Sequence, residues 1–93
     1  MNYIQTSKLK ENPDNPRSIS DEKFAKLVQS IKDFPEMLEL RPIVVDSEMV
    51  VLGGNMRLKA LKEIGVKEVP VLKAGDLTEE QKRQFIIKDN VGF

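Results

Sequence analysis

A pair of glycines, Gly53 and Gly54, joins a strand-like run to a helical pattern, and this junction constrains the fold more than any other feature. Residues 49–52 read Met-Val-Val-Leu, a β-branched run that is typical of a strand. Apolar residues within 56–64 recur with helical spacing, and Gly65 follows as a helix C-cap. The sequence therefore predicts a strand that ends in a Gly-Gly-Asn turn and passes directly into a helix.

Apolar spacing and capping residues place the other helices. Within residues 24–31 the apolar side chains recur at i, i+3, i+4 and i+7, which is one face of a helix. Ser20 precedes this stretch as an N-cap, and Pro35 ends it because a proline disfavours helical geometry in the residue before it. Nearer the end of the chain, Thr78 and Gln81 form a capping box that opens a last helix.

Together these signals predict an α+β fold in which a small mixed β-sheet is flanked by about three helices. Two β-branched runs separated by a short polar segment should form a hairpin. The strand around Pro70 is expected at a sheet edge or at a strand start, since proline lacks the N–H that a central strand uses. In chain order we expect a strand at 3–9, a loop at 11–19, a helix at 20–34, a connector with room for one helical turn at 35–41, the hairpin strands at 42–45 and 49–52, a helix at 56–64, a strand at 69–72 and a helix from 78 to about 90.

The composition bounds the chemistry. The 93 residues suffice for one domain, expected to span 1–93, and they include neither cysteine nor histidine. No zinc site or thiolate chemistry is therefore expected, whereas magnesium remains open because it needs only carboxylates and phosphate oxygens. With no bilayer-spanning apolar run and no signal-peptide pattern, we expect no membrane partner and a cytoplasmic location. The formal net charge is zero, which argues against strong non-specific DNA binding by this domain alone.

Arg57 turns the glycine junction into a candidate anion site. It shares a helical stripe with the apolar Ala60, Leu61 and Ile64, so it stands in the first turn of the core-facing side, where an apolar residue would be expected. A helix N-terminus offers unpaired N–H groups and the positive end of the helix dipole, and a guanidinium binds phosphate or carboxylate through two parallel bonds. From spacing alone, a purely structural turn is as good an interpretation, with Arg57 paired to a carboxylate such as Asp33 or Asp46 or reaching out to solvent.

The same segments, taken in chain order, resemble the N-terminal domain of the ParB partition proteins, and the resemblance covers nearly the whole chain. The matching boxes are Asn15-Pro16-Arg17, Leu27-Val28-Gln29-Ser30-Ile31, the Pro-Ile-Val-Val strand at 42–45, Gly54-Asn55-Met56-Arg57-Leu58-Lys59-Ala60, Gly65, the strand at 69–71 and Asp89-Asn90. The resemblance implies a ParB/sulfiredoxin-like fold. It also implies binding of CTP, or of another nucleotide, with Mg²⁺ at these boxes.

The departures from the family pattern narrow these expectations. Asn55 and Met56 stand where the family has Glu and Arg, and Phe93 stands where its last signature has Arg. In sulfiredoxin the catalytic cysteine follows the first glycine of the box, so Asn55 excludes that chemistry. The Gly-Gly-Asn-Met-Arg box and the connector at 34–41 look similar to ParB-like domains of phages and mobile elements, often called ParB-like nuclease domains.

We therefore expect a nucleotide- or phosphate-binding regulatory module that acts in DNA transactions. Arg57 would pair with phosphate oxygens, Arg17 would close over the ligand from its loop, and Asp89 or Asn90 would hold the ligand or a metal-bound water. The backbone N–H groups would come from Gly53, Gly54 and Asn55.

Two alternatives remain open. The first is an enzyme, either a magnesium-dependent ParB-like nuclease or a nucleotide-dependent phosphotransferase or hydrolase, for which spacing selects no carboxylate among Glu11, Asp14, Glu36 and Asp89. The second is a protein-interaction module without a ligand, with an apolar surface around Met37, Leu38 and Leu40; the two leucines could equally belong to the core. The resemblance also implies that the chain is a fragment of a longer protein, whose missing C-terminal regions or a partner would contact DNA.

Overall fold

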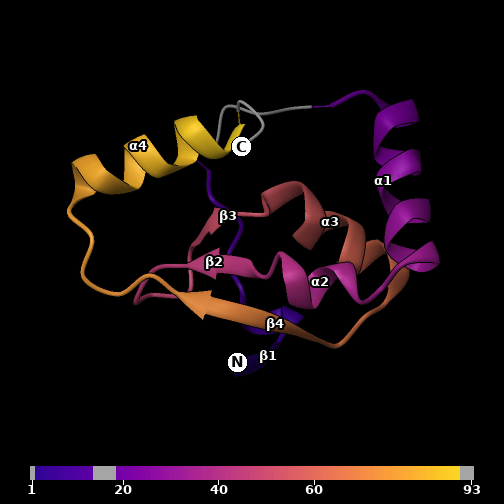
Figure 1. Ribbon diagram of the computed structural model, residues 1–93, viewed down its shortest axis with the longest axis horizontal. Helices are drawn as coiled ribbons and strands as arrows, with labels where there is room; N and C mark the ends of the chain where they lie inside the picture. The colour runs from indigo at the N-terminus through magenta and orange to yellow at the C-terminus, as the bar shows by residue number, and fades with distance from the viewer. Residues whose placement is uncertain (1, 14–18, 91–93) are drawn as a thin grey trace.

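A mixed four-stranded sheet with helices on both sides forms the structure, a computed structural model that describes residues 2–13 and 19–90 (Figure 1). The predicted α+β class and the predicted order of elements are confirmed. The elements are β1 (Asn2–Gln5), the 3₁₀ helix η1 (Thr6–Lys8), α1 (Asp21–Asp33), α2 (Met37–Leu40), β2 (Ile43–Val45), β3 (Val51–Gly53), α3 (Asn55–Ile64), β4 (Glu68–Lys73) and α4 (Glu79–Asn90).

The sheet has the strand order β1-β4-β2-β3 and contains both pairing directions. β2 and β3 pair antiparallel as the predicted hairpin, with an irregularity in register between Val44 and Val45. β4 lies parallel to β2 and antiparallel to β1. The parallel strands β2 and β4 are joined by a long connection that consists of β3 and α3, as parallel pairing requires.

The prediction that Pro70 lies in an edge strand or at a strand start is wrong, because β4 (Glu68–Lys73) lies between β1 and β2 and Pro70 is its third residue. The register explains why a proline is tolerated there. β1 pairs with residues 68–71 of β4, whereas β2 pairs with residues 71–73. The two neighbours are therefore staggered, and Pro70 stands at a level where only β1 lies alongside, opposite Tyr3. A missing N–H costs no ladder bond on a side that has no partner strand.

The hydrophobic core lies between one face of the sheet and the α1–α3 pair. Ser20 caps α1 as predicted, since its Oγ accepts a hydrogen bond from the Lys23 backbone N–H at 3.3 Å. Gly65 ends α3 with a φ of 88°, the left-handed conformation of a C-cap glycine. The buried cluster consists of Leu9, Ile31, Ile43, Val45, Val51, Leu58, Ala60, Leu61, Val69 and Val71.

Two local expectations need correction. The first strand ends at Gln5 rather than at residue 9, because the Thr6 hydroxyl donates to the Val66 carbonyl at 2.9 Å and the chain turns into η1. Leu40 is not a core residue: its side chain is 71% exposed, whereas Leu38 packs against the core. α2 is a single turn, and side chains of one turn project in different directions, so the leucines cannot both face the sheet.

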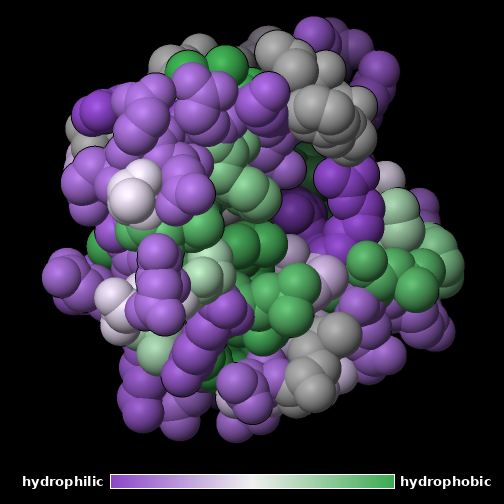
Figure 2. All heavy atoms as spheres, turned by 60° about the vertical axis from the view of Figure 1, so that its left-hand side comes forward, coloured by the Kyte–Doolittle hydropathy of each residue, from purple (hydrophilic) through white to green (hydrophobic). Residues whose placement is uncertain are grey.

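α4 contacts the sheet at β3 and stands apart from α1 (Figure 1). On the face nearest α4, hydrophobic side chains gather in a patch bordered by hydrophilic residues (Figure 2). Among the described residues, Tyr3, Phe34, Met37, Leu40, Leu72 and Ile87 are the large apolar side chains that stay exposed. Within the same part of the chain, no helix has both the length and the apolar character needed to cross a membrane.

Candidate functional site: the glycine turn at the start of α3

The turn between β3 and α3 is built by two glycines with different tasks. Gly53 is the last residue of β3 and pairs with Val44. Gly54 is the N-cap of α3 and has a φ of 98°, which side chains rarely tolerate. Its carbonyl accepts the Leu58 N–H at 2.8 Å, so the helix begins at Asn55, one residue earlier than predicted. The N–H groups of this first turn have no partner within the helix.

Arg57 lies directly over this turn. Its Nη2 is 3.0 Å from the position that a Cβ on Gly54 would occupy, and its Nη1 donates to the Arg41 carbonyl at the end of α2. The side chain is half-buried, as its place on the core-facing stripe predicted. We call the first-turn N–H groups of α3 together with this guanidinium the glycine-turn site.

The structural alternative for Arg57, an ion pair with Asp33 or Asp46, is wrong. Asp33 accepts a hydrogen bond from Gln29 on the exposed side of α1, and Asp46 pairs with Lys82. In the part of the chain that the structure describes, Arg57 forms no salt bridge with any carboxylate. Its half-buried side chain is thus held by a neutral carbonyl, and no carboxylate of the described residues forms a salt bridge with it.

Electrostatics at Arg57 favour an incoming anion. Burial lowers the pKa of Arg57 from its ordinary value, the Arg41 charge lowers this pKa further, and Asp89 acts in the opposite direction. A guanidinium stays charged despite such a shift. A cation that has lost part of its hydration and faces a second cation gains from any anion that takes the place of the lost water.

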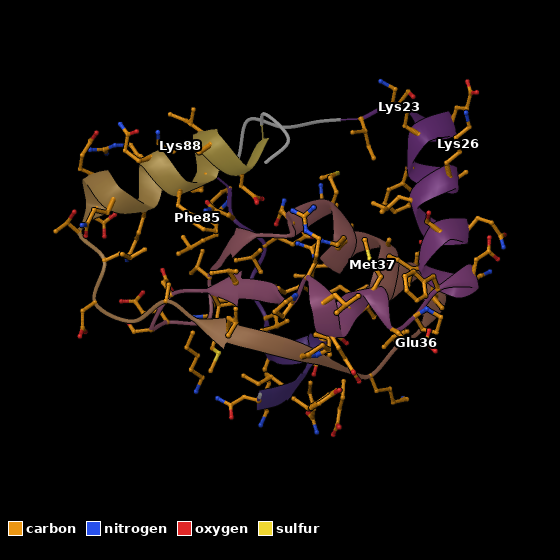
Figure 3. The ribbon with its side chains drawn as sticks, in the orientation of Figure 1. Lys23, Lys26, Glu36, Met37, Phe85 and Lys88 are labelled. Atoms are coloured by element: carbon orange, nitrogen blue, oxygen red, sulfur yellow. The ribbon has the colours of Figure 1, made fainter. Side chains whose placement is uncertain are left out.

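Two residues of α4 reach the turn from the far end of the chain. Phe85 and Asp89 occupy the space beside Gly53: the Phe85 ring lies 2.9 Å, and Asp89 Oδ2 3.3 Å, from where a Cβ on Gly53 would stand. Phe85 reaches from α4 towards β3 (Figure 3). The sequence predicted Asp89 at the site, whereas no site role was predicted for Phe85.

The segment before α1 is fixed against the same turn. Lys10 pairs with Val50 in a parallel bridge, with its N–H 2.9 Å from the Met49 carbonyl and its carbonyl 2.9 Å from the Val51 N–H. Further along, the Asn12 backbone N–H donates to Asn55 Oδ1 at 3.1 Å, and both side chains are buried. This contact could not be predicted from the sequence, because Asn12 had only the character of a loop residue.

Some predicted site residues cannot be placed. Arg17 and Asp14 lie outside the described residues, and Asn90 is described as part of α4 only in its backbone. Among the carboxylates proposed for an enzyme, Glu11 and Glu36 are exposed, and Asp89 is the one that the structure brings to the turn. Within the described ranges, no three acidic residues cluster as metal ligands.

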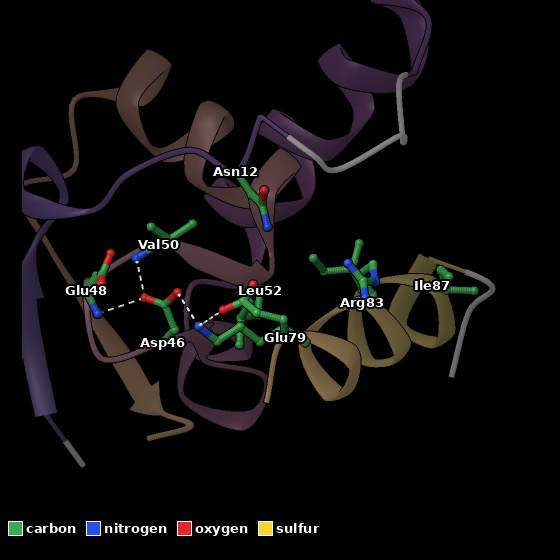
Figure 4. Close-up of a pocket in the computed structure, with 10 residues that line it drawn as sticks. Asn12, Asp46, Glu48, Val50, Leu52, Glu79, Arg83 and Ile87 are labelled. Atoms are coloured by element: carbon green, nitrogen blue, oxygen red, sulfur yellow. Dashed lines mark hydrogen bonds and ion pairs between the residues drawn. The ribbon is translucent and has the colours of Figure 1, made fainter. Parts of the chain in front are cut away.

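A salt bridge holds the start of α4 to the β2–β3 hairpin. Asp46 accepts hydrogen bonds from the Glu48 and Val50 N–H groups at 2.8 and 3.0 Å, and its second oxygen lies 3.4 Å from Lys82 Nζ (Figure 4). Burial raises the pKa of Asp46, but the two N–H donors and Lys82 outweigh burial, and the pKa is lowered. Asp46 and Lys82 also line a pocket of about 640 Å³ under α4, together with Val50, Leu52 and Ile86 among others.

Comparison with known proteins places the chain in a family. The ParB N-terminal domain family matches residues 1–91. The ParB-like nuclease domain-containing protein YnaK of Escherichia coli K12 is 32% identical over 82 residues, which cover 88% of this chain and 91% of that protein. A probable chromosome-partitioning protein ParB of Campylobacter jejuni is 30% identical over 92 residues. This match covers 95% of the chain but only 32% of that relative.

Solved structures agree with this family match. C-terminally truncated ParB from Caulobacter crescentus in complex with CTP-γ-S has a TM-score of 0.83 and 27% identity, over 99% of this chain and 53% of that one. The same protein in complex with the centromeric parS site has a TM-score of 0.77 and 24% identity, over 98% and 47% of the two chains, which shows the shared fold. The glycine turn, the inward arginine, the mixed sheet and these matches lead to one conclusion: the chain belongs to the ParB N-terminal domain family.

Proposed function

We propose that the chain is a nucleotide-binding regulatory module of a DNA-associated protein, with CTP as the first ligand to test. The phosphates would bind at the glycine-turn site. The first-turn N–H groups of α3 would donate to phosphate oxygens, and Arg57 would add a charge-assisted pair of bonds. The predicted setting in a phage or mobile element belongs to this proposal as well.

The observation that carries the proposal is the state of the Arg57 guanidinium. A half-buried structural arginine gains from a carboxylate partner, because removing an unpaired charge even partly from water is costly. Arg57 instead donates to a backbone carbonyl and stands over a glycine whose missing side chain leaves room for it. This arrangement is unfavourable for the free protein and favourable once a phosphate arrives, which is typical of a binding residue.

The relatives support the ligand class. The Caulobacter crescentus ParB structure that is similar to nearly the whole chain contains CTP-γ-S. The Campylobacter jejuni relative is a probable chromosome-partitioning protein, which supports a role in DNA transactions. The chain spans about a third of that relative, so contacts with DNA are proposed for regions or partners beyond this domain.

The site offers a magnesium ion one carboxylate ligand from the described residues. Mg²⁺ is often held by one or two carboxylates together with substrate phosphates. Asp89, next to Gly53, is the carboxylate that the described structure brings to the turn. Bound there, the ion would neutralise phosphate charge and leave Arg57 and the first-turn N–H groups to orient the phosphates.

Isothermal titration calorimetry with CTP, ATP, GTP and pyrophosphate, each with and without Mg²⁺, tests the proposal. We expect CTP and pyrophosphate to bind, and Arg57→Ala to abolish the binding of both. Arg83→Ala is the matched control, because Arg83 lies on the exposed side of α4 and pairs with Glu80. If the wild-type protein binds none of these ligands, the proposal fails.

The name of the YnaK relative keeps a nuclease as the second candidate. A nuclease would need carboxylates to hold its metal ion near the phosphate that is cut. Mg²⁺-dependent cleavage of plasmid DNA that is lost in Asp89→Asn would favour this candidate. Nucleotide binding without any cleavage would favour the regulatory module.

A further inference from the structure

One salt bridge joins α4 to another element of the fold. Lys82 Nζ lies 3.4 Å from Asp46 Oδ2, and the two side chains are only 20% and 8% exposed (Figure 4). The other salt bridges that the described residues form join positions three or four apart within one helix, and each includes a largely exposed side chain. Exposed pairs contribute little, whereas breaking a buried pair leaves an uncompensated charge. The Lys82–Asp46 pair is therefore a discrete anchor for α4.

The start of α4 depends on this anchor because it has no apolar side chains of its own. Residues 79–84 are all polar or charged, and the apolar side chains of the helix begin at Phe85. The next residue, Ile86, is buried. Between the start of α4 and the sheet lies the pocket whose walls include Val50 and Leu52. Apolar packing thus holds the second half of α4, and the salt bridge holds the first.

The anchor and the glycine turn lie on one stripe of α4. Lys82, Phe85 and Asp89 stand at positions i, i+3 and i+7, which share a helix face. Lys82 contacts the β2–β3 hairpin, whereas Phe85 and Asp89 lie beside Gly53 at the other end of β3. At 1.5 Å per residue, Lys82 stands about 4.5 Å from Phe85 along the helix axis, and Asp89 about 6 Å on the other side. A tilt of α4 about Phe85 therefore moves both ends by similar amounts.

We propose that Lys82 and Asp46 are positioning residues for the glycine-turn site, which hold the Asp89 carboxylate in place through the rigid helix between them. The inference rests on the function proposed above, because it concerns the bound ligand. Asp89 Oδ2 lies 3.3 Å from the would-be Cβ of Gly53, and Asp89 is within electrostatic reach of Arg57. A carboxylate in this place repels a bare phosphate but favours a phosphate that carries Mg²⁺.

Two substitutions break the anchor without touching the glycine turn. Lys82→Met keeps the stem of the side chain and removes the ammonium. Asp46→Asn keeps Oδ1, which accepts both hairpin N–H groups, and replaces only the oxygen that faces Lys82. The two variants change the net charge in opposite directions, so a shared effect cannot arise from net charge. Arg83→Met is the matched control, because Arg83 is the next residue and pairs with Glu80 within α4.

Pyrophosphate affinity is measured by calorimetry in EDTA and in Mg²⁺, and the ratio of the two dissociation constants is the Mg²⁺ gain. Asp89→Asn gives the reference value for a site without the carboxylate. Amide hydrogen exchange, followed by NMR, reports how firmly α4 is docked when no ligand is present. Lys82→Arg keeps the ion pair and serves as the conservative variant.

We expect the wild-type Mg²⁺ gain to be about tenfold or more. Lys82→Met and Asp46→Asn should lower it to the level of Asp89→Asn. Their affinity in EDTA should stay unchanged or rise, because Arg57 is untouched and the repelling carboxylate is no longer held near the phosphate. Overall damage to the fold would instead lower affinity under both conditions.

The remaining variants test the route through the helix. Lys82→Met combined with Asp89→Asn should have the same Mg²⁺ gain as Asp89→Asn alone, because the anchor acts only through that carboxylate. Amides of α4 should exchange faster in Lys82→Met and Asp46→Asn, and those of α1 should not. Arg83→Met should match the wild-type protein, and Lys82→Arg should keep most of the Mg²⁺ gain.

Three results would overturn the inference: a wild-type protein without a Mg²⁺ gain, an undiminished gain in Lys82→Met, or an equal loss of affinity with and without Mg²⁺ in that variant. Each of them, with a wild-type protein that binds pyrophosphate, removes the role of the anchor and leaves the proposed function standing. A wild-type protein that binds neither pyrophosphate nor CTP refutes the proposed function and, with it, the positioning role, whatever the exchange data show.

Discussion

The guanidinium of Arg57 lies where a side chain on Gly54 would project, with Nη2 3.0 Å from the position of the absent Cβ. Gly54 thus has two roles in the turn. It adopts a φ of 98°, and it leaves room for the guanidinium beside the N-cap of α3. Neither role can be taken by a larger residue, so the pair makes the turn sensitive to the smallest substitution.

Gly54→Ala should therefore lower both stability and anion affinity. The positive φ alone costs about 1–2 kcal/mol for a residue with a Cβ, and displacement of Arg57 adds to that cost. Gly65→Ala is the matched control, because Gly65 has a φ of 88° but no atom within 4 Å of its would-be Cβ. In urea denaturation and pyrophosphate titration, both variants should lose stability, and only Gly54→Ala should lose affinity. Equal pyrophosphate affinity in the two variants would contradict a role of Gly54 in positioning Arg57 for anion binding.

Arg57→Met should separate stability from binding. The methionine keeps an apolar stem and removes a partly dehydrated cation, so the free energy of unfolding of the ligand-free protein should stay unchanged or rise by up to about 1 kcal/mol. Pyrophosphate binding should disappear. Arg83→Met, on the exposed face of α4, should leave binding intact. A marked loss of stability in Arg57→Met would show instead that the arginine is structural.

Gly53→Ala should loosen α4. A Cβ at this position would stand 2.9 Å from the Phe85 ring, closer than side chains normally approach, so the ring must move and we expect α4 to shift with it. Hydrogen exchange should show faster exchange in α4 and little change in α1. Combining Gly53→Ala with Phe85→Leu should cost less than the sum of the two single variants, because the shared contact is removed only once. If the stability costs of the two single variants added up strictly, the effect of Gly53→Ala would not arise from its contact with Phe85.

Asp46 should make stability depend on pH in acid. Its folded-state pKa is lowered, so its contribution is fully present above the unfolded-state pKa of about 3.9 and is lost as the pH falls through the folded-state value. Asp46→Asn should lose about 1–2 kcal/mol at pH 7, since the Lys82 ammonium then faces an amide. Below pH 4 the difference from wild type should shrink. Urea denaturation between pH 3 and 7 measures this, with the exposed Asp76→Asn as control.

The local elements of the fold could be predicted because their signals are local. Ser20 before an apolar helical face, the Thr78 capping box and Gly65 after α3 each act within a few residues, and all are confirmed. The inward position of Arg57 also followed from helical spacing alone. The position of β4 in the sheet was predicted wrongly from Pro70. A proline shows only that its own N–H is missing, and the sequence does not show how far each neighbouring strand extends.

The sequence by itself determined the glycine turn, the helix that follows it and the arginine in its first turn, because backbone conformation and helical period are properties of neighbouring residues. Only the tertiary structure decided that Arg57 binds the Arg41 carbonyl rather than a carboxylate, that Phe85 and Asp89 close over Gly53, and that Asn55 holds Asn12. Those contacts join segments that are distant in the chain, and their partners are selected by how the sheet and helices pack.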